Sequence, residues 1–281
     1  MMKITTIETG YFKLDGGAMH GVVPRVLWDR FNPADENNLC SWALRCLLVE
    51  IDDRKILIDT GIGDKQDEKF FSHYYLHGEA TLLGSLEKAG LKPEDITDVF
   101  LTHLHFDHVG GAVIKVNEEY QLQFPNADYW THKEHWKWAT EPNDREKASF
   151  LKENILPIEE SGKLKFIDVK DGEEWLPGFA IKYANGHTES MMMPLLSYGN
   201  RKILYVADLL PSVAHIPVPW VMAYDTRPLE TLVEKKRILE EAANNDWYLY
   251  FEHDAHNQMC TLKNTDRGVR MDKTLTIEEL K

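Results

Sequence analysis

The sequence predicts an α/β protein in which helices cover β-sheets that contain antiparallel strand pairs, and three observations lead to this class. Apolar runs rich in β-branched residues recur along the chain and are typical of strands. Two of these runs, 42–51 and 55–59, are separated only by a short polar turn, which indicates an antiparallel hairpin. Segments with helical spacing of apolar residues separate the strand-rich blocks. The hairpin argues against a purely parallel, doubly wound sheet.

The strand-like runs are short, and polar or turn-forming residues bound each of them. We expect strands at 42–51, 55–59, 98–102, 127–131, 163–169, 179–184, 202–208 and 247–253. A helix is expected at 79–90, where Gly90 closes the last turn. The segment 11–40 breaks the pattern because it carries glycines, prolines and aromatic residues, and we expect a long surface loop or hairpin there.

The clearest helix is expected at 226–246. Thr226 is a candidate N-cap, and Pro228 suits the first turn because its missing N–H costs nothing there. Apolar residues recur at three-four spacing, beginning with Leu229 and Val233, and this spacing predicts the buried face of the helix.

Composition excludes several classes of function. The chain has 281 residues and a net charge of −14, which disfavours binding to nucleic acids because their phosphates are repelled. It has neither a signal-peptide pattern nor an apolar run long enough to cross a membrane. The three cysteines are odd in number and form no CxxC motif, so a disulfide framework is not expected. We expect one domain over residues 1–281 and a cytoplasmic location.

The stretch LTHLHFDHVGG at 101–111 places four ligand-type side chains directly after a predicted buried strand. His103, His105 and Asp107 alternate, so in an extended chain they lie on one side, and His108 follows at once. Partly buried polar groups without partners are costly, and a metal ion removes that cost. Imidazoles together with a carboxylate suit zinc, with iron or manganese as alternatives.

Three further candidates stand at or just beyond the ends of predicted strands: His187, Asp208 and His253. A catalytic metal keeps an open coordination position, so the motif at 101–111 needs ligands from elsewhere in the chain. Seven ligands suit two divalent metal ions.

These features resemble the metallo-β-lactamase superfamily: the HxHxDH motif, a His in a GHT turn, an Asp and a His that each close a strand, and the ILIDTGIG run at 56–63. The resemblance covers nearly the whole chain. It implies an αββα four-layer sandwich with two mixed, largely antiparallel sheets and a metal site at one edge. It also implies that Asp59 orients a ligand histidine; the alternative for Asp59 is a simple turn residue.

The resemblance further implies how the ligands divide between the two metals. One metal is held by His103, His105 and His187, and the second by Asp107, His108 and His253. Asp208 then bridges both ions.

Other histidines are not expected to bind metal. His132 and His135 stand among tryptophans, so we expect core packing or a pocket wall. His256 is expected in a supporting or surface role. His215 follows the candidate bridging aspartate and is a candidate to face the site.

Two metal ions support hydrolysis in which a metal-bridging hydroxide attacks the substrate and Asp208 helps to move the proton. The chain looks like the branch of quorum-quenching acyl-homoserine lactonases and methyl-parathion-type hydrolases. Some of those lactonases carry a tyrosine three residues after the bridging aspartate, where this chain has Pro211. Tyr224 or His215 could replace it as a catalytic residue, or the metals could act alone.

We therefore expect a dinuclear hydrolase that opens a lactone of the N-acyl homoserine type, a small, neutral, partly apolar substrate. Tryptophans at 130–138 and Trp220 are candidates for an apolar pocket wall. The alternatives are a phosphotriesterase or arylesterase, a glyoxalase II-like thioesterase, and a persulfide dioxygenase with a single iron. A homodimer packed through the segment 11–40 is also expected.

Overall fold

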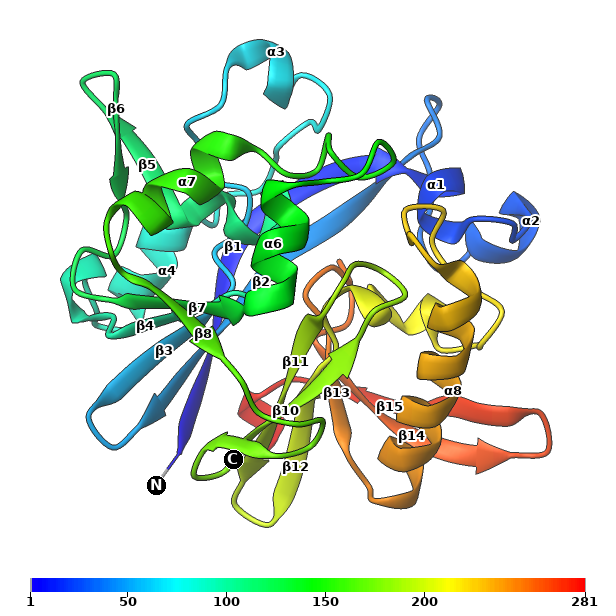
Figure 1. The fold of residues 1–281 in the computed structure, drawn as a ribbon. Helices are drawn as coiled ribbons and strands as arrows, with labels where there is room; N and C mark the ends of the chain where they lie inside the picture. Colours follow the sequence, from blue (N-terminus) through cyan, green and yellow to red (C-terminus); the bar gives the residue numbers. More distant parts are fainter. Residues whose placement is uncertain (1, 281) are drawn as a thin grey trace.

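The computed structural model describes residues 2–280, and its two sheets face each other with helices on their outer sides (Figure 1). The four-layer αββα sandwich expected from the sequence is confirmed. Among residues 2–280, no helix has both the length and the apolar composition that a membrane span requires.

The first sheet has six strands in the order β1-β2-β3-β4-β7-β8. Its strands are β1 (Lys3–Asp15), β2 (Leu39–Ile51), β3 (Arg54–Ile58), β4 (Asp98–Phe100), β7 (Asp128–His132) and β8 (Leu164–Ile167). The β2–β3 hairpin is antiparallel as predicted, but the pairs β3–β4, β4–β7 and β7–β8 are parallel. This sheet is therefore mixed rather than largely antiparallel, because long connections containing helices join these strands.

The second sheet has seven strands in the order β15-β14-β13-β12-β11-β10-β9. Its strands are β9 (Glu174–Leu176), β10 (Phe179–Ala184), β11 (Met191–Tyr198), β12 (Arg201–Tyr205), β13 (Tyr248–Tyr250), β14 (Met259–Thr265) and β15 (Gly268–Leu275). Only the β12–β13 pair is parallel, so this sheet is largely antiparallel as expected. A separate hairpin joins β5 (Val113–Val116) to β6 (Glu119–Leu122).

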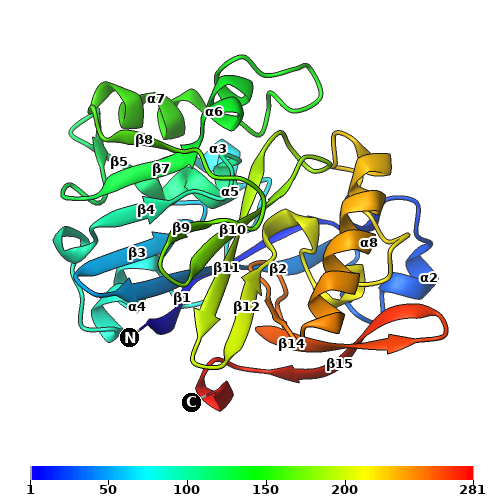
Figure 2. The ribbon, with the colours of Figure 1, turned by 60° about the horizontal axis from the view of Figure 1, so that its bottom comes forward.

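Helices cover the outer face of each sheet (Figure 2). The first sheet packs against α4 (Leu82–Lys88), α6 (Lys133–Thr140) and α7 (Lys152–Glu160), and the second packs against α8 (Pro228–Asn244). The shorter helices are α1 (Gly16–His20), α2 (Arg25–Trp28), α3 (Glu68–Phe71) and α5 (Phe106–Val109). Turns of 3-10 helix lie at Pro93–Asp95, Gly110–Ala112, Ala207–Leu209, Val213–His215 and Glu278–Leu280.

Strand β2 shows why the sheets stack in this way. Leu47 and Val49 belong to the core between the two sheets, whereas Cys46 and Leu48 pack under the helices of the first sheet. Successive side chains of a strand point to opposite faces, so an uninterrupted apolar run is buried on both sides. Each fully buried leucine or valine contributes about 1.5–3 kcal/mol relative to an exposed one.

Helix α8 lies in the predicted place, and its buried face agrees with the prediction only in part: Leu239 is buried as expected, but the first turns are rotated outward. Leu229 and Val233 are 78% and 69% exposed, while Lys235 and Ile238 are buried. The N-cap is Arg227 rather than Thr226, because the Thr226 hydroxyl donates instead to the backbone carbonyl of His187 at 3.1 Å.

The segment 11–40 is more regular and more buried than the expected surface loop or hairpin. Residues 11–15 complete β1, α1 and α2 follow, and β2 begins at Leu39. Met19 and Trp28 are almost fully buried and join the core around Phe12, so hydrophobic packing holds this segment in place.

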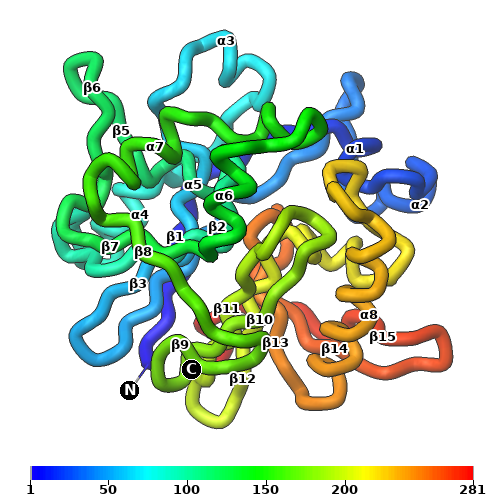
Figure 3. Tube along the Cα trace, in the orientation of Figure 1, coloured from blue at the N-terminus to red at the C-terminus, as the bar shows by residue number. Residues whose placement is uncertain are grey.

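The candidate ligands gather at one edge of the sandwich. The motif at 103–108 follows β4, His187 lies between β10 and β11, Asp208 follows β12, and His253 follows β13. Figure 3 shows the chain trace, in which these four segments lie at the same end of the two facing sheets.

Candidate metal centre

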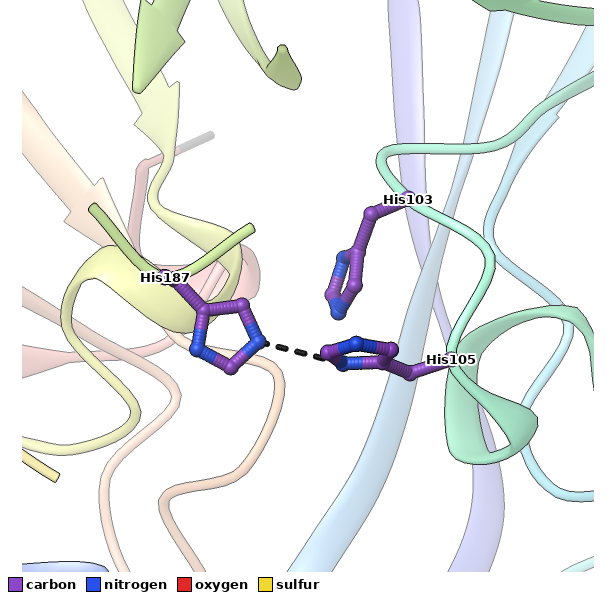
Figure 4. Close-up of side chains that lie close together, drawn as sticks. All are labelled: His103, His105 and His187. Carbon is purple, nitrogen blue, oxygen red and sulfur yellow. Dashed lines mark hydrogen bonds between the residues drawn. The ribbon is translucent and has the colours of Figure 1, made fainter. Parts of the chain in front are cut away.

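Among residues 2–280, four groups of three buried side chains each place one ligand atom per residue within 4.8 Å of the others, and two of these groups share no residue. The first group is His103, His105 and His187; the second is Asp107, His108 and His253. Figure 4 shows the three imidazoles of the first group pointing toward one another. The structure thus brings together the two trios expected from the sequence, although they come from strands of different sheets.

Hydrogen bonds to carboxylates fix the tautomers of two histidines in the first group. His105 Nε2 donates to Glu146 at 2.9 Å, and His187 Nδ1 donates to Asp225 at 2.9 Å. A neutral imidazole carries one N–H, so the other nitrogen of each ring presents a lone pair. These two nitrogens, His105 Nδ1 and His187 Nε2, lie 3.2 Å apart.

The third histidine of this group is fixed through a threonine. The Thr102 hydroxyl donates to Asp59 Oδ2 at 2.7 Å and therefore accepts from His103 Nδ1 at 3.0 Å. His103 Nε2 is then an acceptor that is buried without a partner among the described residues. In the neutral form of the three rings, these remaining nitrogens therefore direct lone pairs toward one another.

The second group repeats this arrangement. His253 Nδ1 donates to the backbone carbonyl of Ala43 at 2.8 Å, and His108 Nδ1 faces Asp59 at 3.1 Å and Glu252 at 3.0 Å. The remaining nitrogens, Nε2 of each ring, lie 3.1 Å apart. The carboxylate of Asp107 lies 3.7 Å from His253 Nε2.

Asp208 stands between the two groups. Its Oδ2 lies 3.3 Å from His187 Nε2, and its Oδ1 lies 3.1 Å from His253 Nε2 and 3.4 Å from His108 Nε2. Each carboxylate oxygen therefore faces a different trio. This is the placement that a bridging ligand requires.

The electrostatics of the cluster are dominated by Asp208. Burial disfavours charge on His253, but the carboxylate of Asp208 outweighs it and raises the pKa of His253 to about 9. Burial likewise opposes ionisation of Asp208, yet the surrounding histidines hold the pKa of its carboxyl well below the usual range. Burial and the nearby Glu252 raise the pKa of Asp59 to about 7.

The donor set fits metal ions. Crowded ring nitrogens and an unpartnered buried nitrogen are unfavourable in a dry site, and a cation placed among their neutral rings satisfies them. Imidazole nitrogens with carboxylate oxygens are the ligands of zinc and similar transition metals, and outer carboxylates that orient the imidazoles are typical of such sites.

A cavity of about 330 Å³ opens onto this cluster. Its wall includes His105, Asp107, His187, Asp208 and His253, together with Leu14, Met19, Tyr74, Phe106, Arg145, Met222 and Tyr224. The expected tryptophan wall is wrong: Trp136 lies in the core of the first sheet, and Trp138 donates to Glu146. Methionine, tyrosine and phenylalanine side chains form the apolar wall instead.

The two candidate catalytic residues beside the ligands have different surroundings. Tyr224 lines the cavity, and burial raises the pKa of its phenol to about 12. His215 is buried outside the cavity wall, where its Nε2 donates to the Met19 carbonyl at 2.8 Å and its Nδ1 accepts from Ser212. The structure therefore does not bring His215 to the cavity.

Three histidines that were not expected to bind metal lie in surroundings that account for them without a metal ion. His135 Nε2 accepts from the backbone N–H of Leu104 at 2.8 Å, and its Nδ1 donates to the Glu189 carbonyl at 2.6 Å. His132 caps α6, and His256 is exposed. These positions agree with packing and surface roles.

The sequence did not single out three carboxylates that contact the candidate ligand histidines: Glu146, Asp225 and Glu252. Glu252 had a weak signal because it directly precedes His253. Glu146 and Asp225 are separated from the histidines they contact by dozens of residues and stand in no motif.

The model of the Metallo-beta-lactamase superfamily matches residues 45–253, a span that contains all seven candidate ligands. The chain belongs to the metallo-β-lactamase superfamily. It is a metal-dependent hydrolase of that superfamily, and the expected family and fold are confirmed.

Several known proteins and solved structures are similar to the chain over most of its length. N-acyl homoserine lactonase AiiA from Bacillus thuringiensis subsp. kurstaki is 25% identical over 268 residues, which cover 90% of this chain and 96% of the relative. A probable metal-dependent hydrolase from Staphylococcus aureus has a TM-score of 0.86 at 28% identity and covers 98% of each chain. AidC, a dizinc quorum-quenching lactonase, has a TM-score of 0.80 at 26% identity, covering 98% of this chain and 95% of AidC.

Proposed function

We propose that this chain is a dinuclear metallohydrolase that opens the ring of an N-acyl homoserine lactone or a closely similar lactone. The observation that carries the proposal is the position of Asp208, whose two oxygens face two separate trios of ligand atoms. The similarity to lactonases over 90% of the chain supports the substrate class.

Zinc is the ion that the donor set favours, with iron or manganese as alternatives. His103, His105 and His187 would hold one ion, Asp107, His108 and His253 the other, and Asp208 both. When bound, two such ions supply a hydroxide nucleophile at neutral pH and polarise the carbonyl of the substrate.

Side chains of the cavity wall would contribute to proton transfer and substrate binding. Asp208 lies at the cavity wall, where its carboxylate can hold a water that passes a proton toward the leaving alkoxide of the opened ring. An ordinary phenol is protonated at neutral pH, and burial raises the pKa of Tyr224 further, so its hydroxyl can donate a hydrogen bond to the substrate carbonyl. Met19, Phe106 and Met222 form an apolar wall suited to an acyl chain.

The test is hydrolysis by the zinc-loaded protein, followed with a pH indicator over lactones of increasing acyl length. We expect kcat/KM of about 10⁴ M⁻¹s⁻¹ or more for the best lactone. A paraoxon-type triester, S-lactoylglutathione and a structured RNA are the comparison substrates. Efficient cleavage of the triester or the thioester with negligible lactone turnover would overturn the lactonase assignment.

The role of Tyr224 is tested by Tyr224→Phe, with Tyr74→Phe as the matched control from the same cavity. Loss of a hydrogen bond made in the transition state lowers kcat by about 10²-fold. Equal small effects of the two variants would show that the metals act on the carbonyl without a phenol.

We further propose a homodimer that packs through the segment between β1 and β2. Val22 and Val26 are 94% and 85% exposed there, which is unusual for neighbouring apolar side chains. Light scattering at micromolar concentration should give twice the mass of the chain, and Val22→Ser with Val26→Ser should return it to a monomer. A monomeric wild-type mass contradicts this proposal.

A further inference from the structure

Arg145 joins two segments that line the cavity. It lies in the connection between α6 and α7, and its Nη2 donates to the backbone carbonyl of Ala223 and, at 3.1 Å, to that of Asp225. These carbonyls flank Tyr224, whose side chain lines the cavity. The two hydrogen bonds hold the guanidinium in a defined place at the wall.

Most of the hydrogen-bonding capacity of Arg145 remains unused by the protein. A guanidinium has five N–H groups in a rigid plane. Among residues 2–280, no acceptor lies within hydrogen-bond distance of Nε or Nη1 of Arg145. The side chain is exposed, so these donors are available to a molecule that enters the cavity.

The guanidinium of Arg145 differs in charge from the rest of the cavity wall. Arg145 is the one lysine or arginine among the described residues of the cavity wall. Three acidic side chains line that wall, and each lies beside a candidate ligand histidine: Glu146 accepts from His105, Asp208 faces His187 and His253, and Asp107 lies 3.7 Å from His253 Nε2. Much of the rest of the wall is apolar. The N–H groups on Nε and Nη1 of Arg145 are therefore charged donors without a protein acceptor among the described residues.

We propose that Arg145 determines specificity by donating to an acceptor oxygen of the substrate at a distance from the scissile bond, and that this oxygen is the carbonyl of an N-acyl amide. The inference rests on the proposed lactonase function and deepens it. An amide carbonyl accepts a charge-assisted hydrogen bond without adding charge. A lactone that carries only an alkyl chain has no such acceptor.

The kinetic experiment compares wild type with Arg145→Met and Arg145→Lys on two lactones of matched length. One is N-hexanoyl homoserine lactone, and the other is a γ-alkyl lactone without the amide. Lys147→Met is the control, because Lys147 is an exposed neighbour that pairs with Asp144 and does not line the cavity. Zinc content is measured for every variant. Arg145 contacts the backbone carbonyl of Asp225, and the side chain of Asp225 accepts the hydrogen bond from His187, so a substitution of Arg145 could also disturb this candidate metal ligand.

The expected result is selective. Arg145→Met should lower kcat/KM for the amide lactone by about 10- to 100-fold, the range for losing a hydrogen bond to a charged group. The alkyl lactone should change by less than about 3-fold, and the zinc content should remain that of wild type. Arg145→Lys should recover part of the loss because it keeps the charge but not the planar donors. An equal loss for both lactones, or none for either, would overturn the proposal.

A binding experiment separates this inference from the proposed function. N-hexanoylglycine and octanoate each carry a carboxylate for the metal site, but only the former carries an amide. Calorimetry on the zinc-loaded protein should show that Arg145→Met weakens N-hexanoylglycine selectively. If that selectivity is found while the wild type opens no lactone, the lactonase function fails and the amide site stands. If Arg145→Met weakens both ligands equally, Arg145 binds the carboxylate and the inference is wrong.

Discussion

Glu146 accepts a hydrogen bond from Nε2 of His105 at 2.9 Å, and this contact leaves Nδ1 of the same ring to face His187. Trp138 donates to the other oxygen of Glu146 at 2.6 Å, so the carboxylate is held on both sides. Burial opposes ionisation of Glu146, but the contact with His105 outweighs it and lowers the pKa to about 2. The ionised carboxylate of Glu146 therefore fixes the orientation of His105, a candidate metal ligand.

Glu146→Gln should weaken metal binding at the group formed by His103, His105 and His187. Outer carboxylates that orient ligand histidines contribute about 10- to 100-fold to metal affinity. Zinc competition titration measures this change. Glu141→Gln, at an exposed position of the same connection, is the matched control and should bind zinc like the wild type.

Replacing ligands should remove the ions selectively. His187→Ala should lower the occupancy of the first group and His253→Ala that of the second, whereas Asp208→Ala should lower both because its oxygens face both trios. Metal analysis of the purified variants measures the occupancy. Two ions retained at full activity in Asp208→Ala would refute the bridging role.

Removal of the metal should destabilise the fold. Without an ion, the ring nitrogens that would bind it are crowded against each other at 3.1 and 3.2 Å. A ligand that binds only the folded state adds about 4 kcal/mol of stability at a free concentration of about 1,000 times its Kd. Thermal unfolding should therefore show a lower Tm after chelation and recovery when zinc is added back. An unchanged Tm after complete removal would contradict the clustered geometry.

Metal affinity should increase with pH. Asp208 raises the pKa of His253 to about 9 in the metal-free protein, so below that pH a proton occupies the nitrogen that the metal needs. Binding then releases the proton, and affinity should rise by about tenfold per pH unit for each proton displaced until pH reaches about 9. Zinc titrations at pH 6, 7 and 8 measure the slope. Asp208→Asn should flatten it, since the histidine then loses its carboxylate partner.

The turn after the HxHxDH motif should be intolerant of any side chain. A Cβ on Gly110 would lie 2.0 Å from the backbone carbonyl oxygen of Ile62, which cannot move without displacing the turn after β3. Gly110→Ala should therefore cost about 3 kcal/mol or more, as overpacking of a tight core does. Gly84→Ala is the control in helix α4, where the nearest atom belongs to the Thr81 side chain. Chemical denaturation compares the two variants.

The sequence by itself determined the family, the four-layer fold and the set of seven ligand-type residues. These features are encoded locally, because each candidate ligand stands in or just after an apolar run, and strand ends of facing sheets meet at a common edge. The β2–β3 hairpin and the ends of helix α4 are likewise set by short turns and caps within a few residues.

Only the tertiary structure decided which groups complete the site. Glu146 and Asp225 meet their histidines across 41 and 38 residues of sequence, and neither belongs to a local pattern. The same holds for Arg145, whose partners lie 78 and 80 residues away.

Packing also decided how much of the predicted apolar face of helix α8 is buried. Helix α8 buries Lys235 and exposes Val233, because the Lys235 ammonium donates to three backbone carbonyls of the loop that leads to the cavity. Apolar spacing predicts where a helix forms, but the hydrogen bonds available in the folded chain decide which side of it is buried.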